Sequence, residues 1–255
     1  MMKTCAVIPA AGLGQRLQRK LPKILTPLTG TDTIWSHLRK KLISLVDHIH
    51  LIISPKHETL FRQVLNQDMN DNVVSISFQA EPIGMGDAIF CGFPIWSQAD
   101  RIVVIWGDQV FVSQDTIMNA LAIHAGHAKT IALPLMQLSH PYVEYEFDAY
   151  DRLIDIKQSR EGEICALRGY ADVGTFVLSV PDLLSAWNVY LNHHSLGAKT
   201  NEINFLPFLP FLSRKGWVIR RVNVLDTIET RGINTPDDLA FFQTFSHSQK
   251  KIDEK

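Results

Sequence analysis

The hydrophobic positions along this chain form short continuous runs, separated by stretches in which apolar residues recur at helical spacing. Buried parallel strands are apolar on both faces, whereas surface helices repeat apolar residues every three or four positions. The continuous runs predict strands at Cys5–Ile8, His50–Ser54, Val74–Gln79, Ile102–Trp106 and Thr130–Leu135. The stretches between them predict helices at Ile34–Val46, Glu58–Asn66, Gly86–Trp96 and Asp115–Ala122. Alternation of strands and helices predicts an α/β fold with a doubly wound, mainly parallel, Rossmann-like sheet.

The pattern changes after Pro141, where polar turn signals separate shorter apolar runs. Such spacing is typical of antiparallel strands, which we place at Tyr142–Phe147, Leu153–Gln158 and Asp172–Ser179. Helices at Pro181–Tyr190 and Glu202–Lys215, a strand at Val218–Val224 and a helix after Pro236 complete the chain. We expect one domain over residues 1–245, with an antiparallel insertion at about 141–180 and a frayed tail over 246–255.

Composition narrows the possible classes of protein. The 255 residues can bury a sizeable core. A net charge of −1 provides no basic field to hold nucleic acid. We see neither a membrane-spanning apolar run nor a signal peptide. Cys5, Cys91 and Cys165 are too far apart in sequence to favour a disulfide framework or a zinc site. We therefore expect a cytoplasmic protein that binds neither nucleic acid nor membranes, in an oligomeric state that the sequence leaves open.

A loop rich in small residues follows the first predicted strand and carries the clearest candidate chemistry. Without bulky side chains, backbone N–H groups can approach an anion closely, so the loop indicates a phosphate site. Its small residues are Ala10, Ala11, Gly12 and Gly14. Arg16 and Lys23 follow, and both can place positive charge on phosphate oxygens.

Two familiar phosphate motifs do not fit this loop. A P-loop requires Gly-Lys-Ser/Thr after its glycines, and that sequence is absent. The third glycine of a dinucleotide fingerprint is replaced by Leu17. The glycines alone leave a plain strand-to-helix turn open, but Arg16 and Lys23 favour the phosphate site.

Several motifs in order give the chain a resemblance to the sugar-phosphate nucleotidyltransferase family. These are Ala-Ala-Gly-Leu-Gly-Gln-Arg at 10–16, Leu-Pro-Lys at 21–23, the segment 79–88 that begins with Gln79, Trp-Gly-Asp at 106–108 and Arg-Gly-Ile-Asn at 231–234. The chain is most similar to the uridylyltransferase domain of bacterial bifunctional N-acetylglucosamine-1-phosphate uridylyltransferases. One difference within the loop is Gln15, which stands where the family usually has threonine.

The resemblance implies a nucleotide-diphospho-sugar transferase fold and a Mg²⁺-dependent reaction. In it, a sugar 1-phosphate attacks the α-phosphorus of a nucleoside triphosphate, with UTP favoured, and pyrophosphate leaves. Arg16 and Lys23 would bind the phosphates. Gln79 and Gly84 would bind the base. Asp108 and Asn234 would bind Mg²⁺.

The residues themselves support two of these roles. Asp108 follows a predicted strand, and ligands of open α/β sheets bind at the carboxyl ends of strands. Its carboxylate suits Mg²⁺, although Gly-Asp alone is more commonly a turn or cap. The Gln79 amide offers a donor and an acceptor, which matches uracil or thymine. A plain strand-end glutamine stays open, as do guanine and cytosine.

The acceptor side departs from the family pattern. Tyr145 stands in the segment that corresponds to the family's Gly-Tyr-Gly, Gln158 near its sugar-binding glutamate, and Asp172 at its Asn-Thr-Gly. We expect these three residues to contact the acceptor, whose identity the sequence leaves open. Tyr142, Arg160 and Glu161 lie in the same antiparallel insertion, and contact with the acceptor stays open for each, although a structural or solvated role is the commoner one.

Two other functions remain open. A nicotinamide-dependent oxidoreductase is disfavoured by Leu17 and Lys23. A catalytically silent nucleotide-sugar-binding homologue is disfavoured because Arg16, Lys23, Asp108 and Asn234 are all present. His124 and His127 are spaced as metal ligands could be, but they lack an evident third partner.

Overall fold

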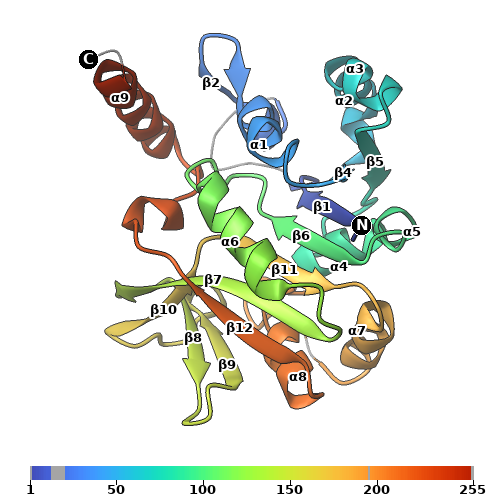
Figure 1. The fold of residues 1–255 in the computed structure, drawn as a ribbon, viewed down its shortest axis with the longest axis vertical. Coiled ribbons are helices and arrows are strands. Elements are labelled where there is room, and N and C mark those ends of the chain that lie inside the picture. Colours follow the sequence, from blue (N-terminus) through green and yellow to red (C-terminus); the bar gives the residue numbers. More distant parts are fainter. Residues whose placement is uncertain (1, 13–20, 195, 254–255) are drawn as a thin grey trace.

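The computed structural model describes residues 2–12, 21–194 and 196–253, and a large mixed β-sheet organises them (Figure 1). Its strands are β1 (Thr4–Pro9), β4 (His48–Ile53), β5 (Val74–Phe78), β6 (Arg101–Ile105), β7 (Thr130–Ser139), β8 (Val143–Phe147), β9 (Leu153–Gln158), β10 (Arg168–Asp172), β11 (Thr175–Ser179) and β12 (Val218–Asn223). They lie in the order β5-β4-β1-β6-β11-β7-β10-β8-β9, with β12 beside β7. Strands β2 (Pro27–Thr29) and β3 (Asp32–Thr33) form a separate small ribbon.

Four neighbouring strands, β5, β4, β1 and β6, form the parallel part of the sheet. Central strand β1 is buried on both faces, as its continuous apolar run predicts. Strand β11 pairs antiparallel with both β6 and β7 and separates them. The predicted α/β fold with a mainly parallel sheet and an antiparallel part is therefore confirmed.

Helices cover both faces of this sheet. They are α1 (Ile34–Leu42), α2 (Glu58–Val64), α3 (Asn66–Asn70), α4 (Met85–Cys91), α5 (Phe93–Trp96), α6 (Gln114–His124), α7 (Leu183–Leu191), α8 (Phe208–Arg214) and α9 (Pro236–Asp253). Alternate residues of β1 enter two separate cores: Ala6 and Ile8 pack with α1 and α6, whereas Cys5 and Val7 pack with α4 and α7. Within the described ranges, no helix has the length and apolar character needed to cross a membrane.

Several predicted elements differ from the structure. The strand expected at Asp172–Ser179 is divided between β10 and β11, because Gly174 turns the chain with a φ of +70°. The helix expected from Glu202 begins only at Phe208, since residues before it pair their backbone with another loop. The helix expected over Gly86–Trp96 is interrupted at Gly92, between α4 and α5.

Helix α9 also differs from expectation, because it continues to Asp253 and includes most of the segment for which we expected a frayed tail. In Figure 1 it projects away from the sheet and carries the C-terminal end of the chain.

Two buried histidines make the stability of this fold depend on pH. His50 on β4 hydrogen-bonds the hydroxyls of Ser75 and Ser77, and His124 on α6 lies 3.1 Å from the Ser179 hydroxyl. Burial lowers the pKa of each histidine from 6.5 to about 4. Because the unfolded chain binds these protons at higher pH, the free energy of unfolding should fall as the pH decreases from 6.5 to 4. Each histidine contributes up to about 1.4 kcal/mol per pH unit.

Urea unfolding at pH 7, 5.5 and 4.5 measures this dependence. A His124→Asn variant, which no longer titrates at that position, should show a shallower decline than the wild type. Equal free energies of unfolding at pH 7 and pH 4.5 in the wild type would contradict the assignment.

Candidate active site

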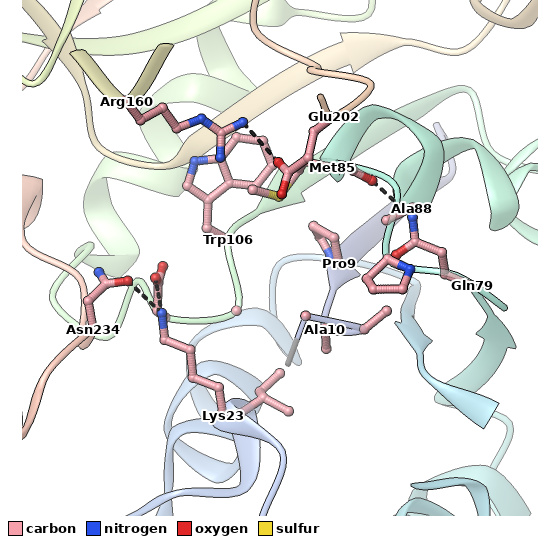
Figure 2. A pocket seen from close by; sticks show the side chains of 17 residues that line it. Pro9, Ala10, Lys23, Gln79, Met85, Ala88, Trp106, Arg160, Glu202 and Asn234 are labelled. Atoms are coloured by element: carbon pink, nitrogen blue, oxygen red, sulfur yellow. Dashed lines mark hydrogen bonds and ion pairs between the residues drawn. The ribbon is translucent and has the colours of Figure 1, made fainter. Parts of the chain in front are cut away.

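A pocket of about 490 Å³ opens at the carboxyl ends of β1 and β6, where a doubly wound sheet binds ligands (Figure 2). It is lined by Pro9, Ala10, Ala11, Gly12, Lys23, Ile24, Gln79, Pro82, Gly84, Met85, Ala88, Trp106, Gly107, Asp108, Arg160, Glu202 and Asn234. Most of the residues predicted for phosphate, base and metal binding therefore share one cavity.

One end of the pocket is formed by three polar side chains from distant parts of the chain. The Lys23 ammonium donates to Asp108 Oδ2 at 2.5 Å and to Asn234 Oδ1 at 2.8 Å. Lys23 and Asp108 are both largely buried, with side-chain exposures of 22% and 18%. A carboxylate oxygen and an amide oxygen thus converge on a single cation.

Backbone contacts hold Asp108 and Asn234 close together. The Ile233 N–H donates to the Asp108 carbonyl at 3.0 Å, which joins the two loops directly. A Cβ on Gly232 would lie 3.1 Å from Asp108 Cγ, so glycine permits this approach. The Asn234 N–H donates to Asp238 at the start of α9. Although burial opposes it, hydrogen bonds from Asn234 and Thr235 hold the pKa of Asp238 below its usual value.

The loop after Asp108 is held by two charged side chains that sequence reasoning missed. The Lys41 ammonium donates to the carbonyls of Val110 and Val112, and burial lowers the pKa of Lys41 to about 8. Glu229, which lies five residues before Asn234, accepts from the Ser113 N–H at 2.9 Å. Neither residue belongs to a local motif, so only the tertiary structure identifies this support.

The other end of the pocket contains Gln79, which is 4% exposed. Its Nε2 donates to the Gly84 carbonyl at 3.0 Å and to Asp87 Oδ2 at 2.8 Å. Both partners are acceptors, so this orientation of the amide is the only one that satisfies them. Among the described residues, the amide nitrogen is thus engaged internally, whereas the sequence suggested that Gln79 offers both a donor and an acceptor to a base.

Gly84 is required by its backbone geometry. Its φ is +139°, and a Cβ there would lie 2.5 Å from the backbone N and O of Ile203. The predicted base-binding segment is consequently packed against the loop around residue 203.

The Gly-rich loop is only partly within the described residues. Ala10, Ala11 and Gly12 line the pocket, and the Ala10 N–H donates to the Ile52 carbonyl at 2.7 Å. A Cβ on Gly12 would meet no atom of the described residues within 4 Å. Gly14 and Arg16 lie outside the described residues.

The three residues expected to bind the acceptor do not line this pocket. Tyr145 is buried, and its hydroxyl donates to Asp172 Oδ2 at 3.0 Å. Asp172 also accepts from the Gly174 N–H, and burial raises the pKa of its carboxyl. Gln158 is 3% exposed within the sheet. Their polar groups are directed at internal partners or buried, so the expected acceptor contacts are not supported by the structure.

Three residues that were not predicted as site residues line the pocket, namely Trp106, Arg160 and Glu202 (Figure 2). Sequence reasoning treated Arg160 as structural or solvated, and it placed Glu202 in a helix.

His124 faces Ser179 rather than a metal cluster. Among the described residues, no group of three or more histidine, cysteine or acidic side chains could hold a metal ion.

The doubly wound sheet with a pocket at its carboxyl edge is the arrangement in which open α/β folds bind their ligands. The family model described as the MobA-like NTP transferase domain matches residues 6–173, and the chain belongs to this family.

Curated relatives agree with this assignment. The chain is 26% identical to the bifunctional protein GlmU of Desulfitobacterium hafniense over 242 residues, which cover 92% of this chain and 50% of that protein. It is 26% identical to GlmU of Mycolicibacterium paratuberculosis over 255 residues, which cover 93% of this chain and 49% of that protein. A probable UDP-N-acetylglucosamine pyrophosphorylase of Acanthamoeba polyphaga mimivirus is 30% identical over 134 residues, 52% of each chain. The chain thus spans about half the length of these relatives.

Proposed function

We propose that this chain transfers a nucleoside monophosphate, UMP, from UTP to a sugar 1-phosphate in a Mg²⁺-dependent reaction. The observation that carries the proposal is the convergence of Asp108 and Asn234 on the Lys23 ammonium, inside a pocket that also contains Gln79 and Gly84. The family and the names of the relatives support the same reaction.

The donor set at one end of the pocket fits Mg²⁺. This ion prefers oxygen ligands, commonly takes one or two from the protein, and completes its shell with water and substrate phosphates. Asp108 would supply a charged oxygen and Asn234 a neutral one. The Lys23 ammonium held between these oxygens supports the view that they are directed at one cation position.

The reaction joins a phosphate oxygen of the acceptor to the α-phosphorus of the triphosphate, while the bond to the departing pyrophosphate breaks. Mg²⁺ would offset the charge that accumulates on the phosphate oxygens. Lys23 would hold the reacting phosphates, and Arg16 would hold those that leave. Most of the rate enhancement in such transfers comes from positioning and charge stabilisation, which these residues would provide.

The preference for uracil rests on the acceptor atom that Gln79 presents. With its amide nitrogen engaged by Gly84 and Asp87, Gln79 can accept through Oε1 from the N3–H of uracil. Guanine also presents a ring N–H, so the triphosphate preference has to be measured.

Thermal unfolding in the presence of UTP, CTP, GTP, ATP and NAD, each with Mg²⁺, tests nucleotide binding. UTP is expected to raise the melting temperature most, since a ligand that binds only the folded state stabilises it. Stabilisation by NAD alone would favour the oxidoreductase. Stabilisation by UTP without pyrophosphate release on any sugar phosphate would favour a silent homologue.

A Gln79→Ala variant probes base recognition in the same assay. Loss of one hydrogen bond should weaken UTP binding by about 3- to 10-fold and reduce the preference for UTP over the other triphosphates. Gln67→Ala, which alters an exposed glutamine on α3 that bonds Asp71, is the matched control. An unchanged preference for UTP in Gln79→Ala would remove Gln79 from the base-binding site.

A further inference from the structure

We infer that Arg160 and Glu202 form the pair that recognises the acceptor, and that they bind adjacent hydroxyl groups of a sugar whose ring stacks on Trp106. This inference rests on the proposed function. It replaces Tyr145, Gln158 and Asp172 as the residues that select the acceptor.

The pair lies on the wall of the pocket where an acceptor has room to bind. Figure 2 shows Arg160 and Glu202 above Trp106, on a different side of the cavity from Lys23 and from Gln79. Arg160 Nη2 and Glu202 Oε2 are 3.2 Å apart. Their side chains are about one-third exposed, so a ligand in the cavity can reach both.

A buried carboxylate fixes Arg160 and Glu202 in place. Glu161, which is 7% exposed, accepts from the Thr200 hydroxyl at 2.6 Å and from Asn204 Nδ2 at 2.9 Å. Asn204 Oδ1 in turn accepts from Arg160. Although burial opposes it, these hydrogen bonds lower the pKa of Glu161 to about 2. Glu161 is thus ionised at neutral pH, and it ties the segment carrying Arg160 to the loop carrying Glu202.

A second contact joins this loop to the predicted base-binding segment. The Ile203 N–H donates to the Ile83 carbonyl at 2.7 Å, and the Gly86 N–H donates to the Ile203 carbonyl at 2.9 Å. Because Gly84 has no Cβ, the two backbones can pack this closely. Glu202 is therefore held at a set position relative to Gln79, as a residue that orients one substrate against the other must be.

The available atoms suit sugar hydroxyls. The internal contacts of Arg160 use Nε and Nη2, so within the described part of the chain the two N–H groups of Nη1 are left for a ligand. Glu202 supplies an acceptor beside them. A hydroxyl both donates and accepts, so two neighbouring hydroxyls match this donor–acceptor pair.

Trp106 completes the subsite with an apolar surface. Its ring packs against Phe176 and Phe205, with centroid distances of 5.0 and 6.0 Å, which restrict its orientation. A flat aromatic face can pack against the C–H groups of a pyranose ring. The ligand class that fits is therefore a sugar 1-phosphate with adjacent free hydroxyls.

Steady-state kinetics of pyrophosphate release test this inference. The probes are the 1-phosphates of glucose, galactose, mannose and N-acetylglucosamine, each with UTP and Mg²⁺. With the best probe, Glu202→Gln and Arg160→Lys should each raise the KM for the sugar phosphate by about 10-fold or more, because a hydrogen bond to a charged group is lost or misplaced. The KM for UTP should stay within about 2-fold of the wild-type value.

Controls separate recognition from general damage. Glu58→Gln and Arg62→Lys alter an exposed ion pair of the same kind on α2 and should leave both KM values unchanged. Glu161→Gln acts through the other two residues. Glu161→Gln should raise the KM for the sugar phosphate. Adding Arg160→Lys to it in a double variant should raise this KM little further. Melting temperatures identify any variant that fails to fold. If either Glu202→Gln or Arg160→Lys fails to fold, the KM of the other variant tests the inference.

The possible failures are distinguishable. If the wild type releases pyrophosphate but neither variant changes the KM for the sugar phosphate, the assignment of Arg160 and Glu202 is wrong and the proposed function stands. If the wild type releases no Mg²⁺-dependent pyrophosphate with any probe, both the proposed function and this inference are overturned.

Discussion

Replacing Lys23 by methionine should lower turnover by about two orders of magnitude or more, the loss typical of removing a positioned charge donor from a transition state. Methionine keeps much of the length of the side chain but cannot hold phosphate oxygens. Rapid-quench or steady-state pyrophosphate assays would measure the loss. Near wild-type turnover in Lys23→Met would contradict the assignment.

The same substitution should have the opposite effect on metal binding in the absence of nucleotide. The Lys23 ammonium lies 2.5 Å from Asp108 Oδ2 and 2.8 Å from Asn234 Oδ1, the oxygens that would bind the metal. Like charges at such separations repel strongly, so the ammonium and a divalent ion compete for these oxygens. Titration with Mn²⁺, followed by electron paramagnetic resonance, should show tighter binding to Lys23→Met than to the wild type.

Lys40→Met is the matched control, since Lys40 is an exposed lysine on α1. It should change neither turnover nor Mn²⁺ affinity. Weaker Mn²⁺ binding to Lys23→Met than to both reference proteins would show that the oxygens are not held for a metal.

Replacing Asp108 by asparagine is expected to have the largest effect of any single substitution. The variant keeps an oxygen ligand but loses the negative charge that attracts the metal, while Lys23 remains. Because a bound metal ion supplies several kcal/mol of transition-state stabilisation, turnover should fall by about 1000-fold or more. The residual rate should depend only weakly on Mg²⁺ concentration.

Asp115→Asn provides a comparison, since it removes an exposed carboxylate at the start of α6. That variant should retain wild-type turnover and Mg²⁺ dependence. If Asp108→Asn also kept its Mg²⁺-dependent turnover within about 10-fold of wild type, Asp108 would not be the metal ligand.

The sequence predicted the parallel part of the fold well, and the reason is physical. Strand β1 is apolar from Cys5 to Ile8 and is buried on both faces, so consecutive apolar residues in the sequence predict its burial. The position of Asp108 followed from the same pattern, because a polar residue directly after a buried strand lies at the carboxyl edge of the sheet. Lys23 and Asn234 were then indicated by the order of family motifs, and the structure brings them to Asp108.

The acceptor side could not be predicted in this way. Whether Tyr145 faces a ligand or Asp172 depends on contacts between separate strands, which local patterns do not record. Glu202 reaches the pocket because Ile203 pairs with residues about 120 positions earlier in the chain. Likewise, the network around Glu161 becomes visible only when both segments that it joins are folded together.

Breaks within elements were missed for a related reason. Residues 172–179 have the composition of one strand, but the positive φ of Gly174 redirects the chain between two neighbours of β7. Glycine permits this turn without requiring it, so the sequence alone does not decide between a continuous strand and a break.

Pyrophosphate release tests the central claim most directly. Purified protein would be assayed with UTP, CTP, GTP and ATP against a panel of sugar 1-phosphates, with Mg²⁺ and with EDTA. Our account predicts release that requires Mg²⁺, a sugar 1-phosphate and a triphosphate together, that is fastest with UTP, and that falls by about 1000-fold or more in Asp108→Asn. Absence of Mg²⁺-dependent release with every combination, from protein that binds UTP and is folded, would contradict it.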